Sequence, residues 1–286
     1  MSLVAFNRYG KSQIRLVKVR RDREPHDIVD LTLDVQLEGA FEAVYTAGDN
    51  SSCIPTDTMK NTVYAMAGDG LKGAPEAFAL AVARHFAASQ QVDRATVAIR
   101  EHGWARIETP MGPAEDAFVR SGRGTRLALA RAARNGIELE AGIEDLTVLK
   151  TTKSGFVGFE RDAFTTLPEV DDRIMATKIT ATWAYAREAV DRGLDLDRAW
   201  ERAVERLLTT FAEHVSPSVQ TSIWIMASAM LDAEPAIEWV RMVLPNLHHW
   251  EVDLARLGLE NRGEIFVATT EPHGLIDATV RRRPAG

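Results

Sequence analysis

Residues 54–58, Ile-Pro-Thr-Asp-Thr, carry more polar side chains than the start of a helix requires. Two hydroxyls flank a carboxylate directly after a proline, and an amphipathic run begins at Val63. Such side chains are typical of a helix N-cap, but a cap needs only one of them. Thr56 and Asp57 are therefore candidates both for capping a helix and for contacting a ligand.

Lys11 follows Tyr9 and Gly10 at the start of a run that could be a strand. A lysine on a strand is usually solvated, which is the plain interpretation of this residue. To accept a proton near neutral pH, its amine would need a pKa well below the ordinary value of about 10.4. Burial or a neighbouring cation would lower the pKa in that way.

Three side chains in the second half of the sequence could hold a flat anion. Arg173 offers a planar fork of donors, and Phe156 offers an aromatic face. Gln220, in the opening turn of an expected helix, can both donate and accept hydrogen bonds. The structural alternatives are a local salt bridge between Arg173 and the two aspartates before it, and a core contact between Phe156 and Phe159.

The Asn-Leu-His-His run at residues 246–249 bears on whether a metal is bound. Adjacent strand residues point to opposite faces, so Asn246 and His248 share a face, while His248 and His249 are poorly placed to hold one ion. The single cysteine, Cys53, excludes an intrachain disulfide and any multi-cysteine metal site. No phosphate loop or dinucleotide fingerprint is visible. The sequence therefore predicts neither a metal nor a cofactor.

Alternating residues predict a half-buried strand in the first part of the chain. Leu31, Leu33, Val35 and Leu37 alternate with polar residues between positions 30 and 38. A period of two places every apolar side chain on one face of the strand. This pattern is typical of an antiparallel sheet with one face in water.

Two pairs of helices are predicted, the first beginning near residue 56 and at Pro75. In the second pair, one helix has an apolar face over residues 200–211, and the other begins at Ser216 and Pro217. Strand-like runs flank these helices at residues 11–20, 30–38, 92–107, 117–131, 136–150, 176–185, 237–252 and 264–281. The order strand, strand, helix, helix, strand, strand thus occurs twice, which predicts an α+β protein with antiparallel sheets and helices on one face, divided into residues 1–134 and 135–286.

Composition limits the classes of function. The 286 residues are 45% hydrophobic and 26% charged, as in soluble globular proteins. A net charge of -7 argues against a nucleic-acid surface. No signal-peptide pattern or bilayer-spanning apolar run is visible, so we expect a cytoplasmic protein without a membrane partner. The end, residues 283–286, also lacks a Ser-Lys-Leu-type peroxisomal address.

Taken together, short motifs spread in order along the chain resemble the urate oxidase (uricase) family. They are Tyr9-Gly10-Lys11, Gly48-Asp49-Asn50, residues 54–62, residues 142–150 (GIEDLTVLK), residues 158–162, Asp172-Arg173-Ile174, Ser218-Val219-Gln220 and residues 244–249. The resemblance implies an oxidase without a cofactor. Its reaction would convert urate, dioxygen and water into 5-hydroxyisourate and hydrogen peroxide.

The resemblance also implies roles in proton movement and at an oxygen site. Lys11 would be the catalytic base, and Thr56 would hydrogen-bond its amine and hold a water or dioxygen species over the substrate. His248 would relay a proton to this pair. Asn246 would hold dioxygen or the peroxide opposite the purine ring. Asp57 would meet the substrate edge through its backbone amide.

For substrate binding, the resemblance implies that Phe156, Arg173 and Gln220 hold the purine. The apolar residues that would line the pocket are Leu167, Val219 and Ile276. Two positions depart from the family pattern, because Leu247 stands where a lysine is common and Trp250 stands for a smaller aromatic residue. Leu247 should point away from Asn246 and His248, so we expect no effect on the chemistry.

At the level of assembly, the resemblance implies the tunnelling fold, or T-fold, in which subunits join their sheets into a barrel. We expect a homotetramer whose active sites are completed by a neighbouring subunit. Two alternatives are a T-fold enzyme that acts on pterins or guanine nucleotides, commonly with zinc and a glutamate anchor, and a purine-binding tetramer without turnover. Gln220, Asn246 and His248 argue against the zinc-dependent class.

Overall fold

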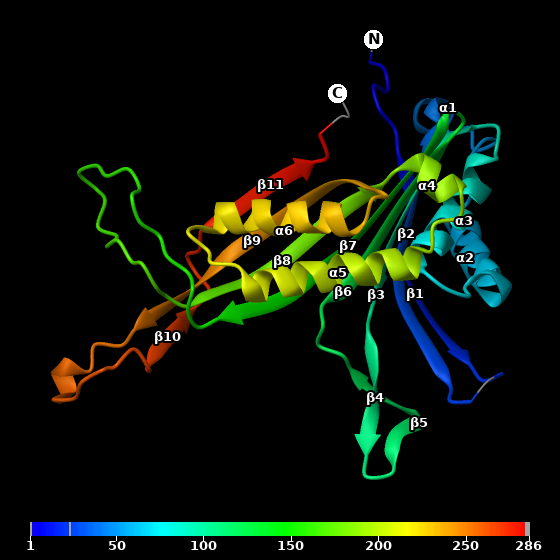
Figure 1. Ribbon diagram of the computed structural model, residues 1–286. Helices are drawn as coiled ribbons and strands as arrows, with labels where there is room; N and C mark the ends of the chain where they lie inside the picture. The colour runs from blue at the N-terminus through cyan, green and yellow to red at the C-terminus, as the bar shows by residue number, and fades with distance from the viewer. Residues whose placement is uncertain (1, 23, 284–286) are drawn as a thin grey trace. The chain divides into compact units, whose positions relative to one another are not determined.

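A computed structural model describes residues 2–22 and 24–283 (Figure 1). Residues 284–286, on which the expectation about a peroxisomal address depends, lie outside the described residues. The chain forms two compact units. Unit 1 contains Met1–Gly142 and Trp183–Trp200, and unit 2 contains Ile143–Thr182 and Glu201–Gly286. The sequence-based division at residue 134 stays a prediction.

Unit 1 is built on an antiparallel sheet. Its strands are hydrogen-bonded in the order β1 (Tyr9–Arg20), β2 (Asp27–Gly39), β3 (Val92–Glu101) and β6 (Thr125–Ala133). Helix α2 (Thr56–Gly70) packs against β1, and α3 (Pro75–Ala87) packs against β3 and β6. Short helices α1 (Glu42–Thr46) and α4 (Arg187–Asp191) also belong to this unit. Strands β4 (Trp104–Thr109) and β5 (Gly112–Arg120) form a hairpin that projects from the sheet (Figure 1).

Unit 2 is centred on β9 (Ile237–Glu251), which pairs antiparallel with both β10 (Phe266–Thr269) and β11 (Leu275–Arg281). Helix α6 (Val219–Ala233) packs on β9 and β11, and the 3-10 turn η1 (Ala255–Leu257) follows β9. Strands β7 (Gly136–Lys150) and β8 (Met175–Tyr185) and helix α5 (Leu196–Glu213) contribute residues to both units. The predicted α+β class with antiparallel sheets is confirmed.

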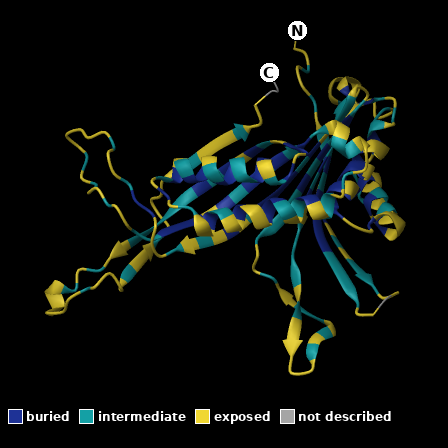
Figure 2. Cartoon of the chain, viewed as in Figure 1, coloured by how far each residue is buried: buried dark blue, intermediate teal, exposed yellow. Residues whose placement is uncertain are grey.

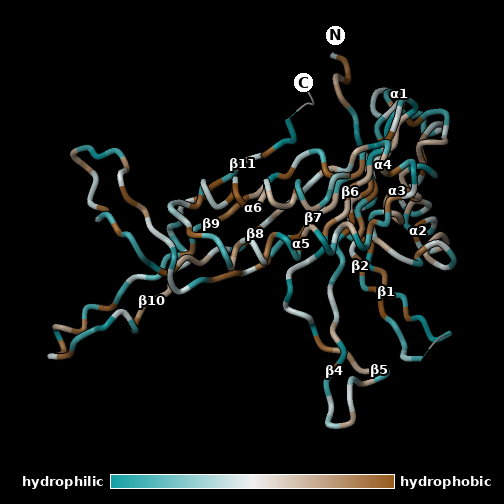
Figure 3. Tube along the Cα trace, viewed as in Figure 1, coloured by the Kyte–Doolittle hydropathy of each residue, from teal (hydrophilic) through white to brown (hydrophobic). Residues whose placement is uncertain are grey.

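The predicted strand at residues 30–38 is β2, and its apolar face forms core. Leu31, Leu33 and Val35 are fully buried. Figure 2 shows buried stretches in dark blue along the sheet, and Figure 3 shows hydrophobic and hydrophilic stretches along the strands. The alternation predicts that the opposite face of β2 is exposed to solvent, but two of its residues are buried. Asp30 and Thr32 are only 3% and 7% exposed.

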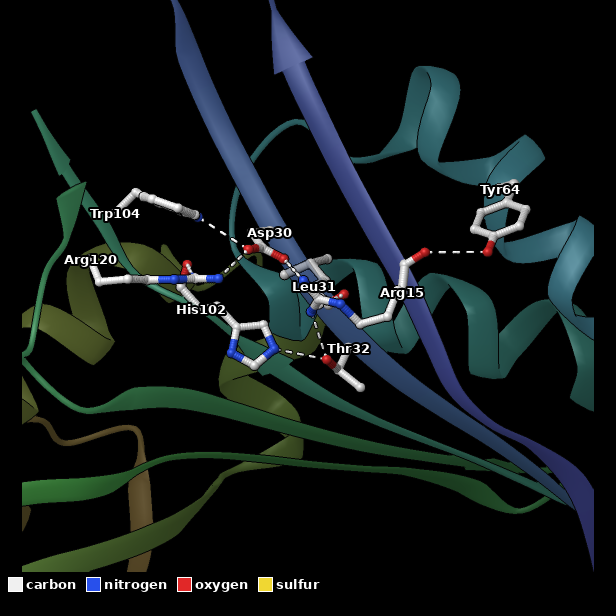
Figure 4. A network of polar contacts seen from close by, with 8 residues as sticks. All are labelled: Arg15, Asp30, Leu31, Thr32, Tyr64, His102, Trp104 and Arg120. Carbon is white, nitrogen blue, oxygen red and sulfur yellow. Dashed lines mark hydrogen bonds and ion pairs between the residues drawn. The ribbon is translucent and has the colours of Figure 1, made fainter. Parts of the chain in front are cut away.

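Asp30 is buried because three groups distant in sequence surround it (Figure 4). Arg15 of β1 forms an ion pair with it, Arg120 of β5 donates at 3.0 Å, and the Trp104 indole donates at 3.1 Å. Burial alone would raise the pKa of Asp30, but the hydrogen bonds from Trp104, Arg15 and Arg120 outweigh burial and lower it. The charged carboxylate therefore ties the β4–β5 hairpin to the sheet.

A second buried carboxylate, Glu76, lies in the first turn of α3 and is fully buried. Arg126 of β6 donates to its two oxygens at 2.7 and 3.0 Å and to Asp197 at 2.8 Å. The guanidinium also lies 4.9 Å from the centre of the Trp200 ring. Burial raises the pKa of Glu76 to about 7 in spite of these contacts, so its charge depends closely on Arg126.

We predict that Arg126→Ala lowers the free energy of unfolding by about 3–5 kcal/mol, because it leaves a carboxyl group buried without its cation. The control is Arg131→Ala on the same strand, which removes a partly exposed ion pair with Glu138 and Glu140. That change should cost at most about 1 kcal/mol. Urea unfolding followed by tryptophan fluorescence measures both. Equal losses in the two variants would contradict the importance of the buried pair.

Candidate functional site

Unit 2 contains an open cleft of about 680 Å³ between the segment that precedes β8 and the end of β9. Its walls bring together four of the side chains singled out in the sequence: Leu167, Arg173, Asn246 and His248. The remaining lining residues are Thr151, Pro168, Val170, Asp172, Ile174, Leu247, His249, Trp250, Glu251, Gly263, Glu264 and Phe266. Leu247, expected to point away from its neighbours, also contributes atoms to the cleft. The cleft is a concave site of the size that small ligands occupy.

Arg173 is half-buried, and its backbone N–H donates to the Ser154 carbonyl at 2.7 Å. Within the described residues its guanidinium forms no ion pair, so the alternative of a local salt bridge is wrong. Asp172 instead accepts a hydrogen bond from the Thr152 hydroxyl at 2.6 Å. Burial lowers the pKa of Arg173, but a guanidinium remains charged at neutral pH. Its donors are therefore available to an anionic ligand.

Phe156 lies beside Arg173, whose Cζ atom is 5.7 Å from the centre of its ring. The ring stacks on Phe159 with centres 4.9 Å apart and planes 11° apart. Backbone hydrogen bonds of 2.6 and 3.2 Å join Phe156 to Val170 and fix this segment. Phe159 covers one face of the ring, so a flat ligand could stack only on the other face.

Asn246 and His248 lie two residues apart on β9. The Asn246 N–H donates to the Gly274 carbonyl at 2.8 Å, and the His248 ring stacks on Trp250 at 5.1 Å. Burial lowers the pKa of His248, and the positive charge of Arg173 lowers it further. The imidazole is therefore neutral near pH 7 and can accept a proton.

Within residues 2–22 and 24–283, no group of three or more His, Cys, Asp or Glu side chains is arranged to bind a metal ion, in this cleft or elsewhere. His249, next to His248, directs its Nδ1 atom to the Leu247 carbonyl at 3.1 Å. None of the helices in those residues is long and apolar enough to cross a membrane.

In unit 1, two of the sequence motifs are joined through the Tyr9 hydroxyl. It accepts a hydrogen bond from the Ile54 N–H at 2.8 Å and donates to the Ile54 carbonyl at 3.2 Å. The ring packs edge-on against Phe41 with centres 4.8 Å apart, and burial raises the pKa of Tyr9 above its ordinary value. Tyr9 therefore holds the chain of Lys11 close to that of Thr56. The motif contained this residue, but sequence reasoning gave it no role.

Gly10 is required by the close approach of β1 to β2. A Cβ atom at this position would lie 1.8 Å from the Val35 carbonyl oxygen. The register of β1 then shifts between Lys11 and Ile14, where Gln13 has a φ of 57°. Lys11 is half-buried directly before this irregularity. The glycine and the bulge together set the position of Lys11 on the strand.

Helix α2 begins at Thr56, but its N-cap is Pro55 and no side chain caps it. The expectation that Thr56 or Asp57 caps the helix is therefore wrong. Asp57 is exposed and accepts hydrogen bonds from Lys60 at 2.5 Å and Asn61 at 2.9 Å. The hydrogen bond from Lys60 is the main cause of its lowered pKa. Capping does not occupy the Thr56 hydroxyl.

The remaining candidates lie in unit 2 but do not line the cleft. Ser218, rather than Ser216, caps α6 by accepting from the Thr221 N–H at 3.1 Å. Val219 is buried and Gln220 is exposed in the first turn of that helix. Ile276 is half-buried on β11.

Known proteins resemble the chain over nearly its whole length. A family model described as Uricase matches residues 7–131 and 139–277. The uricase of Arthrobacter globiformis is 42% identical over 277 residues, covering 96% of this chain and 89% of that protein. The uricase of Emericella nidulans is 39% identical over 299 residues, covering 99% and 98%.

A solved structure shows the same fold. The crystal structure of uricase from Arthrobacter globiformis superposes with a TM-score of 0.93 at 40% identity and covers 100% of this chain and 97% of that one. The sequence resemblance and the prediction of an enzyme are thereby confirmed. The chain belongs to the uricase family.

Proposed function

We propose that this protein oxidises urate with dioxygen and water to 5-hydroxyisourate and hydrogen peroxide without a bound cofactor. The observation that carries the proposal is the guanidinium of Arg173, which is half-buried without an ion pair among the described residues and shares a cleft with Asn246 and His248. Urate is a flat anion at neutral pH, and a planar guanidinium matches its paired acceptors. Relatives named uricase support the same substrate.

Binding would use groups that orient the purine. Arg173 would donate to one edge of the ring, Gln220 would grip the opposite edge, and Phe156 would stack on the ring face. Asp57 would contribute its backbone amide. Apolar contacts would come from Leu167, Val219 and Ile276.

Chemistry would require proton movement and an oxygen site, because deprotonated urate can itself donate electrons to dioxygen. Lys11 and Thr56 would remove the proton, and His248, neutral near pH 7, would relay it. Asn246 would hold dioxygen, and later the peroxide, opposite the purine ring. Orientation and a protected oxygen site would then supply the catalytic effect.

Assembly would complete the site. We propose two ββααββ units with the T-fold, a barrel formed between subunits, and a homotetramer in the cytoplasm. Strand β1 supports this, because it ends the hydrogen-bonded order of strands and an end strand can pair with another chain. Lys11 and Thr56 of one subunit would then meet Arg173, Phe156 and Gln220 of a neighbour.

The direct test follows urate absorbance and peroxide formation in buffer with a metal chelator. We expect the wild type to remain active, since no step is assigned to a metal. Lys11→Ala should bind urate but turn over roughly 100-fold more slowly, because it loses the base. Arg173→Ala should instead raise KM by at least about tenfold, because a charged hydrogen-bonding partner is lost.

Arg256→Ala is the control, since that side chain is 87% exposed and forms an ion pair with nearby Asp253. Its kinetics should equal those of the wild type. Unchanged kinetics in both Lys11→Ala and Arg173→Ala would refute the site. Loss of activity with chelator, restored by a metal, would refute the cofactor-free reaction and favour the zinc-dependent alternative.

Tyr9→Phe tests whether the contact between Tyr9 and Ile54 holds the catalytic pair. The variant keeps the ring and removes the hydroxyl, leaving the Ile54 N–H without its partner. We predict that kcat falls by about fivefold or more, consistent with a lost, partly buried hydrogen bond, while KM changes little. Tyr45→Phe is the control, because that side chain is 52% exposed. Equal effects in the two variants would argue against a positioning role for Tyr9.

The pKa of His248 provides a pH test. Its neutral form would accept the proton, so kcat/KM should fall as the pH drops through a value below the ordinary 6.5 or so. Removing the positive charge in Arg173→Ala favours the imidazolium and should raise that pKa, whereas Arg173→Lys should keep it low. Titration of histidine-labelled protein by NMR measures it. A His248 pKa that is the same in both variants would rule out the charge effect.

A further inference from the structure

The turn between α5 and α6 contains a chain of polar groups that the proposed chemistry does not use. Ser216 and Ser222 are 1% and 0% exposed, and their hydroxyl oxygens lie 2.7 Å apart. The Ser222 oxygen is 2.8 Å from Nε2 of His214. The other ring nitrogen, Nδ1, is 2.7 Å from the Thr210 carbonyl oxygen.

These contacts define the tautomer of His214. The Thr210 carbonyl can only accept, so Nδ1 carries the proton. Burial lowers the pKa of His214, and the charge of Lys150 adds to this effect, so the ring is neutral. The Ser222 hydroxyl lies between Nε2 of His214 and the Ser216 oxygen, to which it donates, and the Ser218 carbonyl oxygen is 3.1 Å away. These contacts hold Ser216 against Ser222.

The backbone of Ser216 holds the segment that carries Phe156 and Arg173. Its N–H donates to the Lys153 carbonyl at 2.8 Å, and its carbonyl accepts from the Gly155 N–H at 2.8 Å. Between these two residues, the Ser154 carbonyl accepts from the Arg173 N–H at 2.7 Å. Through its own backbone, Ser216 thus holds residues 153–155, and Ser154 in turn holds the backbone of Arg173.

Gly155 shows how closely this segment is packed. A Cβ atom there would lie 2.8 Å from the Asp171 carbonyl oxygen and 3.1 Å from that of Val170. These neighbouring atoms belong to the backbone, which cannot move aside as the flexible end of a side chain can. A shift of Ser216 would therefore move the neighbouring chain rather than be absorbed by it.

On its other side the chain of polar groups reaches the first turn of α6. The Ser222 N–H donates to the Ser218 carbonyl at 3.1 Å, and the Ser218 hydroxyl accepts from the Thr221 N–H at 3.1 Å. Gln220 lies within this turn. Ser222 thus connects the turn that presents Gln220 with the peptide that holds Arg173.

We propose that Ser216, Ser222 and His214 form a positioning chain that fixes Gln220 relative to Arg173, so that both can hold one purine. The proposal rests on the substrate-binding roles given to these two residues above. None of the three members touches the substrate. Their effect is on binding geometry, and it should therefore appear in KM rather than kcat.

The test is a double-mutant cycle on steady-state urate oxidation with Ser222→Ala, Gln220→Ala and the double variant. Ser222→Ala should raise KM about five- to tenfold, as expected for one lost buried hydrogen bond, with kcat within about twofold of the wild type. In the Gln220→Ala background the same change should raise KM by less than about twofold, because it acts through Gln220. Ser228→Ala, on the same helix and half-buried, is the matched control and should change nothing.

A full effect of Ser222→Ala in the Gln220→Ala background would overturn the proposal, as would an unchanged KM in the single variant. If Gln220→Ala itself leaves KM unchanged, the substrate-binding role of Gln220 is refuted as well. This single variant therefore distinguishes failure of the binding role from failure of the positioning chain alone. His214→Asn is the second variant should Ser222→Ala fail to fold, because an amide N–H can replace Nδ1 while the nitrogen that meets Ser222 is lost. A normal KM for His214→Asn with an intact melting curve would equally refute the chain.

Discussion

Arg173 keeps a half-buried positive charge that no carboxylate in the described part of the chain neutralises. This unpaired charge sets the electrostatics of the cleft in unit 2. Such a charge loses hydration without gaining an ion pair, which costs free energy unless a ligand replaces the missing partner. Asp172 is adjacent in sequence, yet Thr152 and the Ser154 N–H occupy its oxygens. Burial lowers the pKa of the nearby His248, and the same charge lowers it further. One uncompensated cation thus attracts an anion and helps to keep a base neutral beside it.

In unit 1, the candidate residues Lys11 and Thr56 are positioned by close backbone contacts rather than by an unpaired charge. The Tyr9 hydroxyl bridges to the Ile54 peptide across 45 residues of sequence, and Gly10 permits β1 to approach Val35. Both contacts act on the chain next to Lys11 and Thr56 and leave their side chains uncommitted to structure. Positioning through the backbone is suited to reactive groups, because an amine or hydroxyl used for structure is not available for chemistry.

The sequence located most elements because they depend on local period, but the predicted runs 92–107, 117–131 and 264–281 each extend across two strands of the structure. Alternation at Leu31, Leu33 and Val35 identified the buried face of β2, and Pro75 marked the first residue of α3. It failed on the other face of β2, where Asp30 is buried. The partners of that carboxylate come from β1, β4 and β5, and a period within one strand carries no information about other strands. The predicted cap at Thr56 failed for a different reason, because the helix begins at Thr56 itself and Pro55 occupies the N-cap position.

For the candidate site, the sequence predicted the chemical types but not the pairing. For Arg173, a salt bridge with the two aspartates before it stood as the structural alternative to ligand binding, because proximity in sequence favours such a pair. The structure separates them through Thr152, which lies 21 positions before Arg173 in the chain. Ser216 indicated only a helix start and Ser222 gave no signal, because serine is common in turns and caps. A side chain that contacts a ligand must be of a particular chemical type, which a sequence shows. A side chain that positions such a residue needs only the right geometry, which a single sequence does not show.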